Sequence, residues 1–134
     1  MITREKIEAA IICIDKRFVA HHSTNDWGGS VWIMERKGKA FARIYWYSDD
    51  DQSVYLDCLS VSPCARNKGL GTKMQNIREK IGIDIGASCA YLFVDRNSWQ
   101  KEWYKRRGYV ETGENINEPN TLWMCKVLTN NSIK

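Results

Sequence analysis

The apolar positions near the amino terminus follow a helical period. Between Thr3 and Val19 they recur every three or four residues, which is the spacing of one face of an amphipathic α-helix. Thr3 suits the N-cap of such a helix because its hydroxyl can accept a bond from a backbone N–H. A helix is therefore predicted from about Thr3 to Val19. The segment from His21 to Gly29, which ends in two glycines, is predicted to be a loop.

Three stretches rich in β-branched and aromatic residues follow, separated by polar turns. Such residues favour pleated strands, and short polar connections are typical of antiparallel neighbours. The sequence therefore predicts an antiparallel meander. Its strands are expected at Val31 to Arg36, Ala40 to Tyr47 and Val54 to Val61.

The pattern changes after Pro63. Apolar residues recur at helical spacing from Leu70 to Ile81, so a helix is predicted from near Lys68 to about Ile83. A strand, a helix and a strand in this order form a parallel crossover unit. The chain is therefore predicted to have an α+β fold with a mixed sheet. The remaining predicted elements are a strand at Ala90 to Val94, a helix at Asn97 to Arg107, and strands at Tyr109 to Thr112 and Leu122 to Leu128.

The composition is that of an ordinary globular protein. Hydrophobic residues make up 43% and charged residues 27% of the 134 positions, which suits a single domain spanning residues 1–134. No apolar run reaches the ~20 residues of a membrane span, and the charged start of the chain does not resemble a signal peptide. The five cysteines form no C-x-x-C pair, so neither a disulfide framework nor a metal site is expected. We therefore expect a cytoplasmic protein that does not bind membranes.

The stretch from Leu59 to Thr72 (LSVSPCARNKGLGT) carries the most informative chemistry. A predicted strand leads into a turn with two glycines, and the turn opens directly into a helix. The first amides of a helix have no intrahelical acceptor, and the helix dipole places positive potential there. Gly69 and Gly71 let an anion approach the backbone, while Arg66 and Lys68 add full positive charges. The pattern predicts a phosphate site.

The spacing of this loop narrows the identity of the phosphate ligand. The chain lacks the G-x-x-x-x-G-K-[ST] loop of nucleotide-binding enzymes, and Met74 stands where a dinucleotide fingerprint needs a small residue. Arg66 to Gly71 instead reads R-x-x-G-x-G between a strand and a helix. Here the sequence resembles the GNAT superfamily of N-acetyltransferases, whose acetyl-CoA signature is this loop. For the hexamer alone, a glycine-rich turn with solvated basic residues is the alternative interpretation.

A second motif extends the resemblance. GNAT members carry an asparagine after the next parallel strand and then a helix that ends in Tyr-x-x-x-Gly-Phe/Tyr. This chain has Asn97 and then Tyr104 to Tyr109, which reads YKRRGY. By resemblance, Asn97 hydrogen-bonds the pantetheine arm and Tyr104 lies beside the thioester sulfur. Taken singly, Asn97 also suits an N-cap completed by Gln100, and Tyr104 also suits a core aromatic residue.

The resemblance implies the GNAT acyltransferase fold, in which an antiparallel amino-terminal meander joins a β-α-β crossover with a splayed parallel strand pair. It also implies acetyl-CoA as cosubstrate. Unpaired backbone amides near Leu59 to Val61 are expected to bind the pantetheine and to stabilise an oxyanion. The expected cofactor-binding residues are Leu59, Ser60, Val61, Arg66, Asn67, Lys68, Gly69, Leu70, Gly71, Thr72, Asn97 and Tyr104.

Two catalytic residues are expected. By its position in the family motif, Tyr104 is the candidate general acid for the leaving thiolate. Asp57 falls where several amine acetyltransferases of the family carry a glutamate, and it is the candidate base, acting through a water. A structural or substrate-positioning carboxylate is the alternative for Asp57. Four aspartates lie within the nine positions from Asp49 to Asp57, and their negative charge favours a cationic acceptor.

The sequence thus predicts a transferase that moves an acetyl group from acetyl-CoA to a primary amine by direct attack in a ternary complex. The amine is a small molecule or a lysine side chain. A catalytically silent CoA-binding module of the same fold is the alternative. The net charge of +4 is modest and the basic runs are explained as cofactor contacts, so nucleic acid is not an expected partner. A homodimer is compatible with the resemblance, since small members often pair through their carboxy-terminal strands.

Overall fold

The computed structural model describes residues 5–6, 9–10, 19–24, 29–36, 39–47, 52–66 and 69–128. Residues 5–6 and 9–10 are helical. In the described part of the chain, no helix has the length and apolar character needed to cross a bilayer. The later elements are β1 (Val19–Thr24), β2 (Gly29–Arg36), β3 (Ala40–Tyr47), β4 (Ser53–Val61), the 3-10 helix η1 (Pro63–Ala65), α2 (Leu70–Asp84), β5 (Cys89–Asp95), α3 (Trp99–Lys105), β6 (Val110–Glu114) and β7 (Thr121–Val127).

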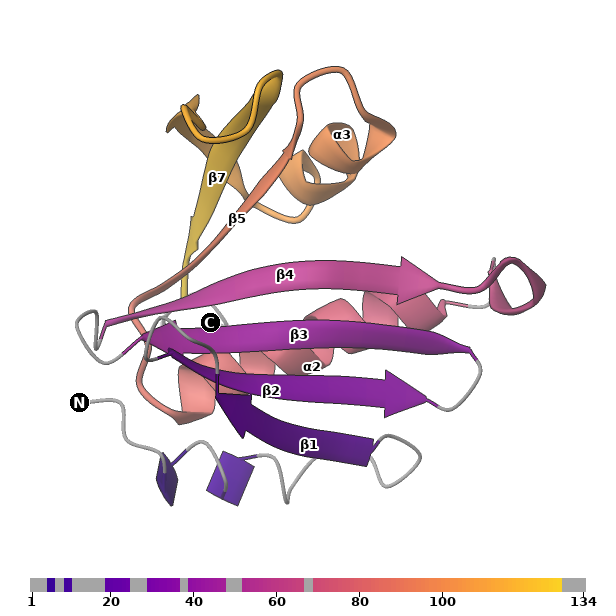
Figure 1. Ribbon diagram of the computed structural model, residues 1–134, viewed down its shortest axis with the longest axis vertical. Helices are drawn as coiled ribbons and strands as arrows, with labels where there is room; N and C mark the ends of the chain where they lie inside the picture. The colour runs from indigo at the N-terminus through magenta and orange to yellow at the C-terminus, as the bar shows by residue number, and fades with distance from the viewer. Residues whose placement is uncertain are drawn as a thin grey trace.

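The described strands form one mixed sheet in the order β1-β2-β3-β4-β5-β7-β6. Strands β1 to β4 are an antiparallel meander, β4 and β5 are parallel, and β5, β7 and β6 are antiparallel again. The connection from β4 to β5 contains α2, which lies behind the meander in Figure 1, while α3 lies beside β5. The predicted α+β fold, with a mixed sheet and a parallel crossover, is confirmed.

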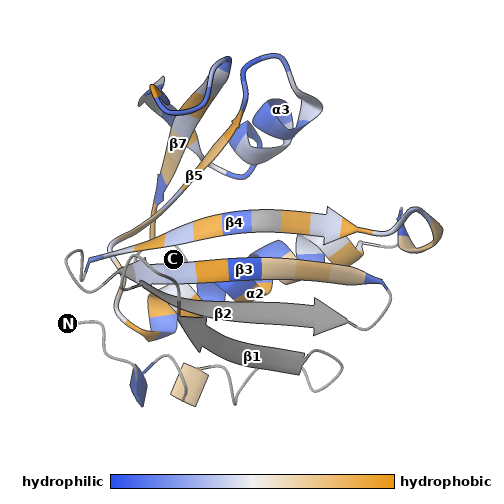
Figure 2. Cartoon of the chain, in the orientation of Figure 1, coloured by the Kyte–Doolittle hydropathy of each residue, from blue (hydrophilic) through white to orange (hydrophobic). Residues whose placement is uncertain are grey.

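The core lies between the sheet and α2 because alternate strand residues face the helix. Along β5 the side chains alternate between half-buried and buried, and Figure 2 shows hydrophobic positions alternating with polar ones along much of β4. This alternation determines the register, since a slip of one residue would move the apolar set to the opposite face. The buried positions include Ala42, Ile44, Val54, Leu56, Met74, Ile81, Ala90, Leu92 and Val94.

The parallel pairing between β4 and β5 is short. Only Ser53 to Tyr55 pair with Cys89 to Tyr91, although β4 continues to Val61. Beyond this point β5 remains paired with β7 along its whole length, and the two parallel strands diverge (Figure 1). Within the described sheet, the later part of β4 therefore has no strand partner on its β5 side, which confirms the predicted splay.

A β-bulge interrupts β4 in the part that β5 leaves open. Arg43 pairs with Asp57, and Phe41 pairs with Ser60, so three steps along β4 match two steps along β3. The extra residue locally disrupts the ladder, bends the strand and increases its twist. The backbone around Leu59 is thereby turned out of regular register at the open edge of the sheet.

A buried arginine joins the two diverging halves of the protein. Arg78 on α2 is 1% exposed, and its Nη1 donates to the main-chain carbonyls of Arg43 and Asp57 at 3.1 and 3.0 Å. Its Nη2 donates to Gln75 Oε1 at 2.6 Å and to the Tyr104 hydroxyl on α3 at 3.3 Å. One side chain thus connects β3 and β4 to α3 where the strand pairing has ended.

The structure differs from the sequence prediction near the amino terminus. The predicted loop is wrong for His21 to Thr24, because Val19–Thr24 form the edge strand β1, paired with β2. Val19 therefore does not belong to the predicted helix, of which residues 5–6 and 9–10 are described as helical and residues 3–4, 7–8 and 11–18 lie outside the described residues. Pairing with a neighbouring strand outweighs the weak local preference of this polar segment.

The second difference concerns the start of α3. The predicted helix from Asn97 to Arg107 is shorter, because Trp99–Lys105 are helical and Ser98 is the N-cap. The Ser98 hydroxyl accepts a bond from Lys101 N at 3.3 Å and donates to the Asp95 carbonyl at 2.7 Å. The interpretation of Asn97 as the N-cap is therefore wrong. The bounds of β2 to β7 and of α2 agree with the prediction to within two residues.

Candidate active site

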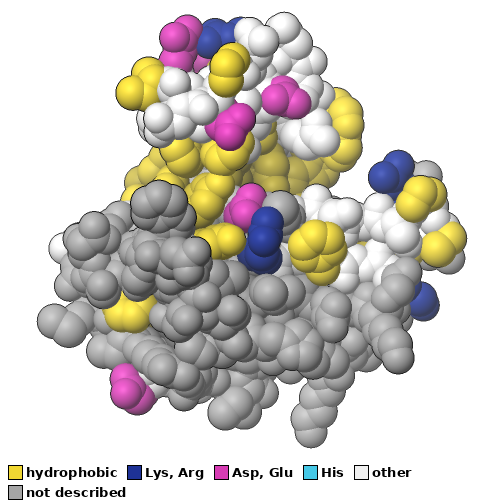
Figure 3. Space-filling model, viewed as in Figure 1, with side chains coloured by type: hydrophobic (Ala, Val, Ile, Leu, Met, Phe, Trp, Pro, Cys, Tyr) yellow, Lys and Arg dark blue, Asp and Glu magenta, His cyan; other side chains and the backbone are white. Residues whose placement is uncertain are grey.

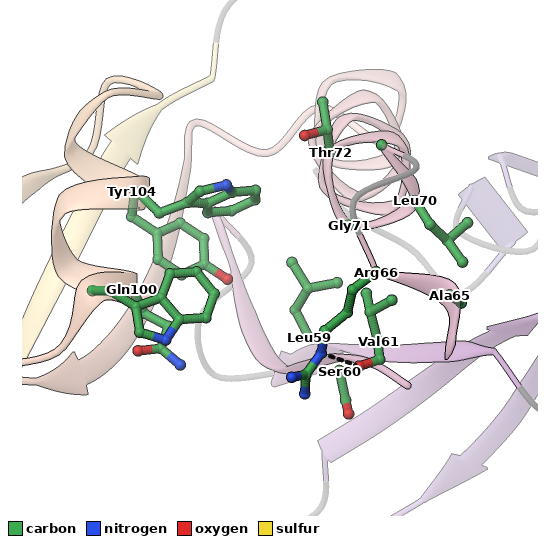
Figure 4. Close-up of a pocket in the computed structure, with 13 residues that line it drawn as sticks. Leu59, Ser60, Val61, Ala65, Arg66, Leu70, Gly71, Thr72, Gln100 and Tyr104 are labelled. Carbon is green, nitrogen blue, oxygen red and sulfur yellow. Dashed lines mark hydrogen bonds between the residues drawn. The ribbon is translucent and has the colours of Figure 1, made fainter. Parts of the chain in front are cut away.

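A pocket of about 730 Å³ lies where β4 and β5 diverge. The open edge of β4 and the helix α3 form its two sides, and the first turn of α2 closes one end. Figure 4 shows Tyr104 and Gln100 facing Leu59 and Ser60 across the pocket. The lining residues are Leu59, Ser60, Val61, Ala65, Arg66, Gly69, Leu70, Gly71, Thr72, Trp99, Gln100, Trp103 and Tyr104.

The start of α2 contributes backbone donors to this pocket. The first intrahelical bond runs from Lys73 N to Gly69 O at 3.0 Å, so the amides of Leu70, Gly71 and Thr72 have no intrahelical acceptor. The N-cap makes no side-chain hydrogen bond, and the first turn holds no acidic residue. Together with the helix dipole, these donors create positive potential that suits an anion.

The two glycines at the start of α2 differ in whether the backbone conformation favours glycine. Gly69 has φ of +76°, a left-handed conformation that favours glycine. Gly71 is helical, and a Cβ there would meet Val61 Cγ2 at 3.6 Å, which is an ordinary contact. The fold therefore favours glycine at position 69 but not at position 71. A missing side chain at Gly71 leaves the backbone open to a group that approaches the amides closely.

Arg66 adds a full charge to the same end of the pocket. The side chain is exposed, and its Nε donates to the Val61 carbonyl at 3.0 Å, which is the dashed bond in Figure 4. This bond attaches the guanidinium to the end of β4 and leaves its terminal N–H groups for another acceptor. The unpaired amides of α2 and a fixed arginine are thus present together, a combination that binds phosphate well.

Tyr104 lies at the buried end of the pocket. It is 7% exposed, and its ring packs edge-on against Trp103 and Tyr109 with centroid distances of 4.9 and 5.3 Å. Its hydroxyl oxygen accepts the bond from Arg78, so the hydroxyl proton remains available for donation. Figure 4 shows this hydroxyl directed from α3 toward β4.

A buried polar network beside Tyr104 links α2 and β7 through Tyr109. Gln75 Nε2 donates to the Tyr109 hydroxyl at 2.8 Å and to Glu79 at 2.9 Å, and Tyr109 donates to Glu79 at 3.1 Å. Lys126 pairs with Glu79 at 2.7 Å. Burial and, next, the negative charge of Glu79 raise the pKa of Tyr109 well above its ordinary value of 10.0. Tyr109 therefore remains a neutral hydrogen-bond donor.

The pocket also contains residues that the sequence analysis missed. Ala65, Trp99, Gln100 and Trp103 line it, and the last three share one face of α3 with Tyr104. Gln100 lies about one helical turn before Tyr104, which is the signal that would have identified it, and Trp99 lies about one turn before Trp103. Trp103 is further held by the Arg107 guanidinium, whose carbon lies 4.2 Å from the ring centroid.

Most of the predicted cofactor residues meet in this pocket. Nine of the twelve line it: Leu59, Ser60, Val61, Arg66, Gly69, Leu70, Gly71, Thr72 and Tyr104. Asn67 and Lys68 lie outside the described residues. Asn97 is exposed in the turn between β5 and α3 and is not a lining residue. The structure therefore brings together the phosphate loop, the β4 edge and Tyr104, but not Asn97.

Asp57 lies on β4 but does not line the pocket. Its Oδ2 pairs with Arg43 Nη2 at 2.8 Å, and the Asp57 side chain is 25% exposed. The predicted acidic positions Asp49 to Asp51 lie outside the described residues.

Figure 3 shows hydrophobic side chains at the junction between the two halves of the sheet. A chain of aromatic ring contacts crosses this junction and includes Tyr45, Tyr55, Tyr91, Phe93 and Trp123.

A family model places these features in a known context. The model of the acetyltransferase (GNAT) domain matches residues 27–111. This match spans more than half of the 134 residues and contains the phosphate loop and Tyr104. The chain belongs to the GNAT acetyltransferase family. The resemblance inferred from the sequence is thereby confirmed.

Solved GNAT structures share the fold of this chain. A GNAT family acetyltransferase from Elizabethkingia anophelis with acetyl-CoA bound has a TM-score of 0.62 at 11% identity, over 85% of this chain and 100% of that one. Ard1 from Thermoplasma volcanium has a TM-score of 0.61 at 14% identity, over 73% and 70%. An acetyltransferase from Thermus thermophilus has a TM-score of 0.60 at 16% identity, over 77% and 66%. A comparison with curated protein sequences gave no match.

The raised pKa of Tyr109 predicts a specific loss of stability at high pH. Above pH 10 the unfolded chain loses the Tyr109 proton while the folded protein keeps it, so the free energy of unfolding falls by up to about 1.4 kcal/mol per pH unit. Between pH 9 and 11, urea denaturation should show a loss about 1 kcal/mol larger for wild type than for Tyr109→Phe. If the free energy of unfolding falls equally with pH in both proteins, the pKa of Tyr109 is not raised in the folded state.

Proposed function

We propose that this GNAT protein transfers an acetyl group from acetyl-CoA to a primary amine, by direct attack of the amine within a ternary complex. The observation that carries the proposal is the order of groups in one pocket. An anion site lies at one end, an unpaired strand edge along one side, and a buried tyrosine hydroxyl at the inner end. A relative of the same fold with acetyl-CoA bound supports this choice of donor.

The residues of the pocket fit the chemistry of CoA. The amides of Leu70, Gly71 and Thr72, with the Arg66 guanidinium, would hold the pyrophosphate. The open edge of β4 near Leu59 would pair with the amides of the pantetheine arm, as one strand pairs with another. In the reaction the acetyl carbon exchanges its bond to sulfur for a bond to nitrogen. The amine must lose a proton, and the released thiolate must gain one.

We assign the donation of the thiolate proton to Tyr104. The bond from Arg78 Nη2 occupies the hydroxyl oxygen of Tyr104 as an acceptor, so the O–H bond can be directed into the pocket. The ring contacts with Trp103 and Tyr109 keep the hydroxyl at a fixed position. A fixed donor at the inner end of the pocket is what general acid catalysis requires.

For the amine proton we propose Asp57, acting through a water. Asp57 lies on β4 two residues before Leu59, and Arg43 holds its carboxylate in one orientation through Oδ2. Its exposure of 25% leaves the carboxylate accessible to water. A carboxylate at this position suits an acceptor that arrives as a cation, either a small amine or a lysine side chain.

The ion pair between Asp57 and Arg43 also favours a second candidate function. A carboxylate held by an arginine can serve the fold alone, and the protein would then be a catalytically silent CoA-binding module. A thiol-release assay with acetyl-CoA separates the two functions. Turnover with any member of a panel of polyamines, aminoglycosides, amino acids and lysine peptides supports the transferase. CoA binding without thiol release across the panel supports the silent module.

The phosphate site is tested by adding a negative charge at Gly71. In Gly71→Asp the carboxylate would lie against the pyrophosphate, so CoA binding should be lost in isothermal titration calorimetry. The fold should persist because a Cβ at this position has room and an acidic residue is favourable in the first turn of a helix. Asn76→Asp, which adds the same charge five positions later on α2 at an exposed position outside the pocket, should retain CoA affinity. Unchanged affinity in Gly71→Asp would reject the site.

The acid role of Tyr104 is tested by removing its hydroxyl. Tyr104→Phe should lower kcat by about 10²-fold, the scale of one positioned proton donor. The KM for acetyl-CoA should change little, since the ring still packs against Trp103 and Tyr109. Single-turnover kinetics ensures that the chemical step is measured. If this step keeps its wild-type rate in Tyr104→Phe, Tyr104 is a packing residue.

The base role of Asp57 is tested by a substitution that keeps its shape. Asp57→Asn should lower kcat by roughly 10²-fold while CoA affinity is unchanged, because Asp57 does not line the cofactor pocket. Asp84→Asn removes a similar carboxylate that pairs with Lys80 on the surface of α2, and it should keep full activity. Full activity of Asp57→Asn would show that the carboxylate only supports the structure.

A further inference from the structure

Trp99 is a large exposed aromatic side chain at the pocket. It is 70% exposed, although tryptophan is among the residues most often covered in a folded protein. In the described part of the chain it makes no ring stacking or cation–π contact, whereas Trp103 contacts both Tyr104 and Arg107. Both indoles line the pocket. Trp99 therefore presents an uncovered aromatic surface to whatever occupies the pocket.

The position of Trp99 is fixed by the start of α3. Trp99 is the first residue of the helix, and the preceding Ser98 is bonded on both sides. Ser98 N and its hydroxyl donate to the Asp95 carbonyl at 3.1 and 2.7 Å, and the hydroxyl accepts from Lys101 N. The backbone that carries the indole is thus held at a capped helix end before any ligand stacks on the ring, so its ordering adds no further entropy cost.

The exposed fractions of two residues on α3 show which end of the pocket is its inner end and which is its rim. Tyr104 is 7% exposed and Trp99 is 70% exposed, and their separation of five positions corresponds to roughly 7.5 Å along the helix axis. The anion site at Gly71 lines the same pocket. A ligand with its acyl end at Tyr104 and its diphosphate at Gly71 therefore has its remaining portion at the rim.

We propose that Trp99 is the platform on which the adenine of CoA stacks. This inference rests on the proposed function, because it takes CoA as the ligand of the pocket. Adenine is the one planar aromatic group of CoA, and it lies beyond the pyrophosphate from the thioester. The pantetheine arm has amide groups that the β4 edge can satisfy, but it has no ring to match an indole. The chemistry of Trp99 therefore selects the nucleobase.

The test compares CoA with 4′-phosphopantetheine, which lacks the 3′-phospho-AMP portion and therefore the adenine. In isothermal titration calorimetry, Trp99→Ala should raise the Kd of CoA by about 5- to 150-fold, the range for losing one base–aromatic stack. The Kd of 4′-phosphopantetheine should stay within about twofold of wild type. Trp99→Phe should retain most of the CoA affinity. Ile116→Ala, which removes an apolar side chain that is 93% exposed and does not line the pocket, is the matched control.

A spectroscopic measurement gives an independent readout of stacking. The fluorescence of 1,N6-etheno-CoA should be quenched on binding to wild type and to Ile116→Ala, and the quenching should be lost in Trp99→Ala at saturating protein. Equal weakening of both ligands in Trp99→Ala would overturn the inference and assign Trp99 to the pantetheine. Unchanged CoA affinity with retained quenching would also overturn it and leave the proposed function intact. Failure of wild type to bind CoA would refute both.

Discussion

The guanidinium of Arg78 is the interaction on which this structure depends. A sheet in which two parallel strands separate loses its backbone hydrogen bonds where they part, and something else must hold the halves at a fixed distance. Arg78 does so from a fully buried position, with bonds to carbonyls on β3 and β4 and to the Tyr104 hydroxyl on α3. Buried arginine is costly unless its donors are satisfied. Four bonds from its two terminal nitrogens meet much of this requirement.

The same interaction couples the fold to the chemistry. The carbonyls that Arg78 holds belong to Arg43 and Asp57, which pair directly before the bulge in β4. The hydroxyl that it holds belongs to the residue proposed as the general acid. The strand edge available to a ligand and the proposed proton donor are therefore positioned by one side chain. Gln75, Glu79 and Lys126 extend this support from α2 to β7.

The pocket is assembled from segments far apart in the sequence, each contributing a different kind of group. The end of β4 provides an open backbone edge, the start of α2 provides amides and a cation nearby, and α3 provides aromatic surface and a hydroxyl. These contributions follow the polarity of an elongated ligand with a charged middle and a less polar reactive end. The comparison with solved GNAT structures concerns the fold, whereas the acceptor and the role of Asp57 belong to the proposed function.

The local features of this protein could be read from the sequence, while the assembly of those features could not. The strand bounds from β2 onward, α2 and the phosphate loop were predictable because hydrophobic period and glycine placement are properties of neighbouring residues. The role of Tyr104 was suggested by a motif, and Trp99 and Trp103 line the same pocket from its helix.

Strand β1 was missed because its polar segment is a strand only through pairing with β2. Asn97 was expected in the cleft, but the chain turns it to solvent before Ser98 caps α3. The partners of Arg78 and Asp57 could not be predicted from the sequence either. Arg78 bonds to β3, β4 and α3 across 21 to 35 positions of the chain. Asp57 pairs with Arg43 across two strands whose register contains a bulge. Such bonds depend on the distance between elements after packing, which only the tertiary structure decides.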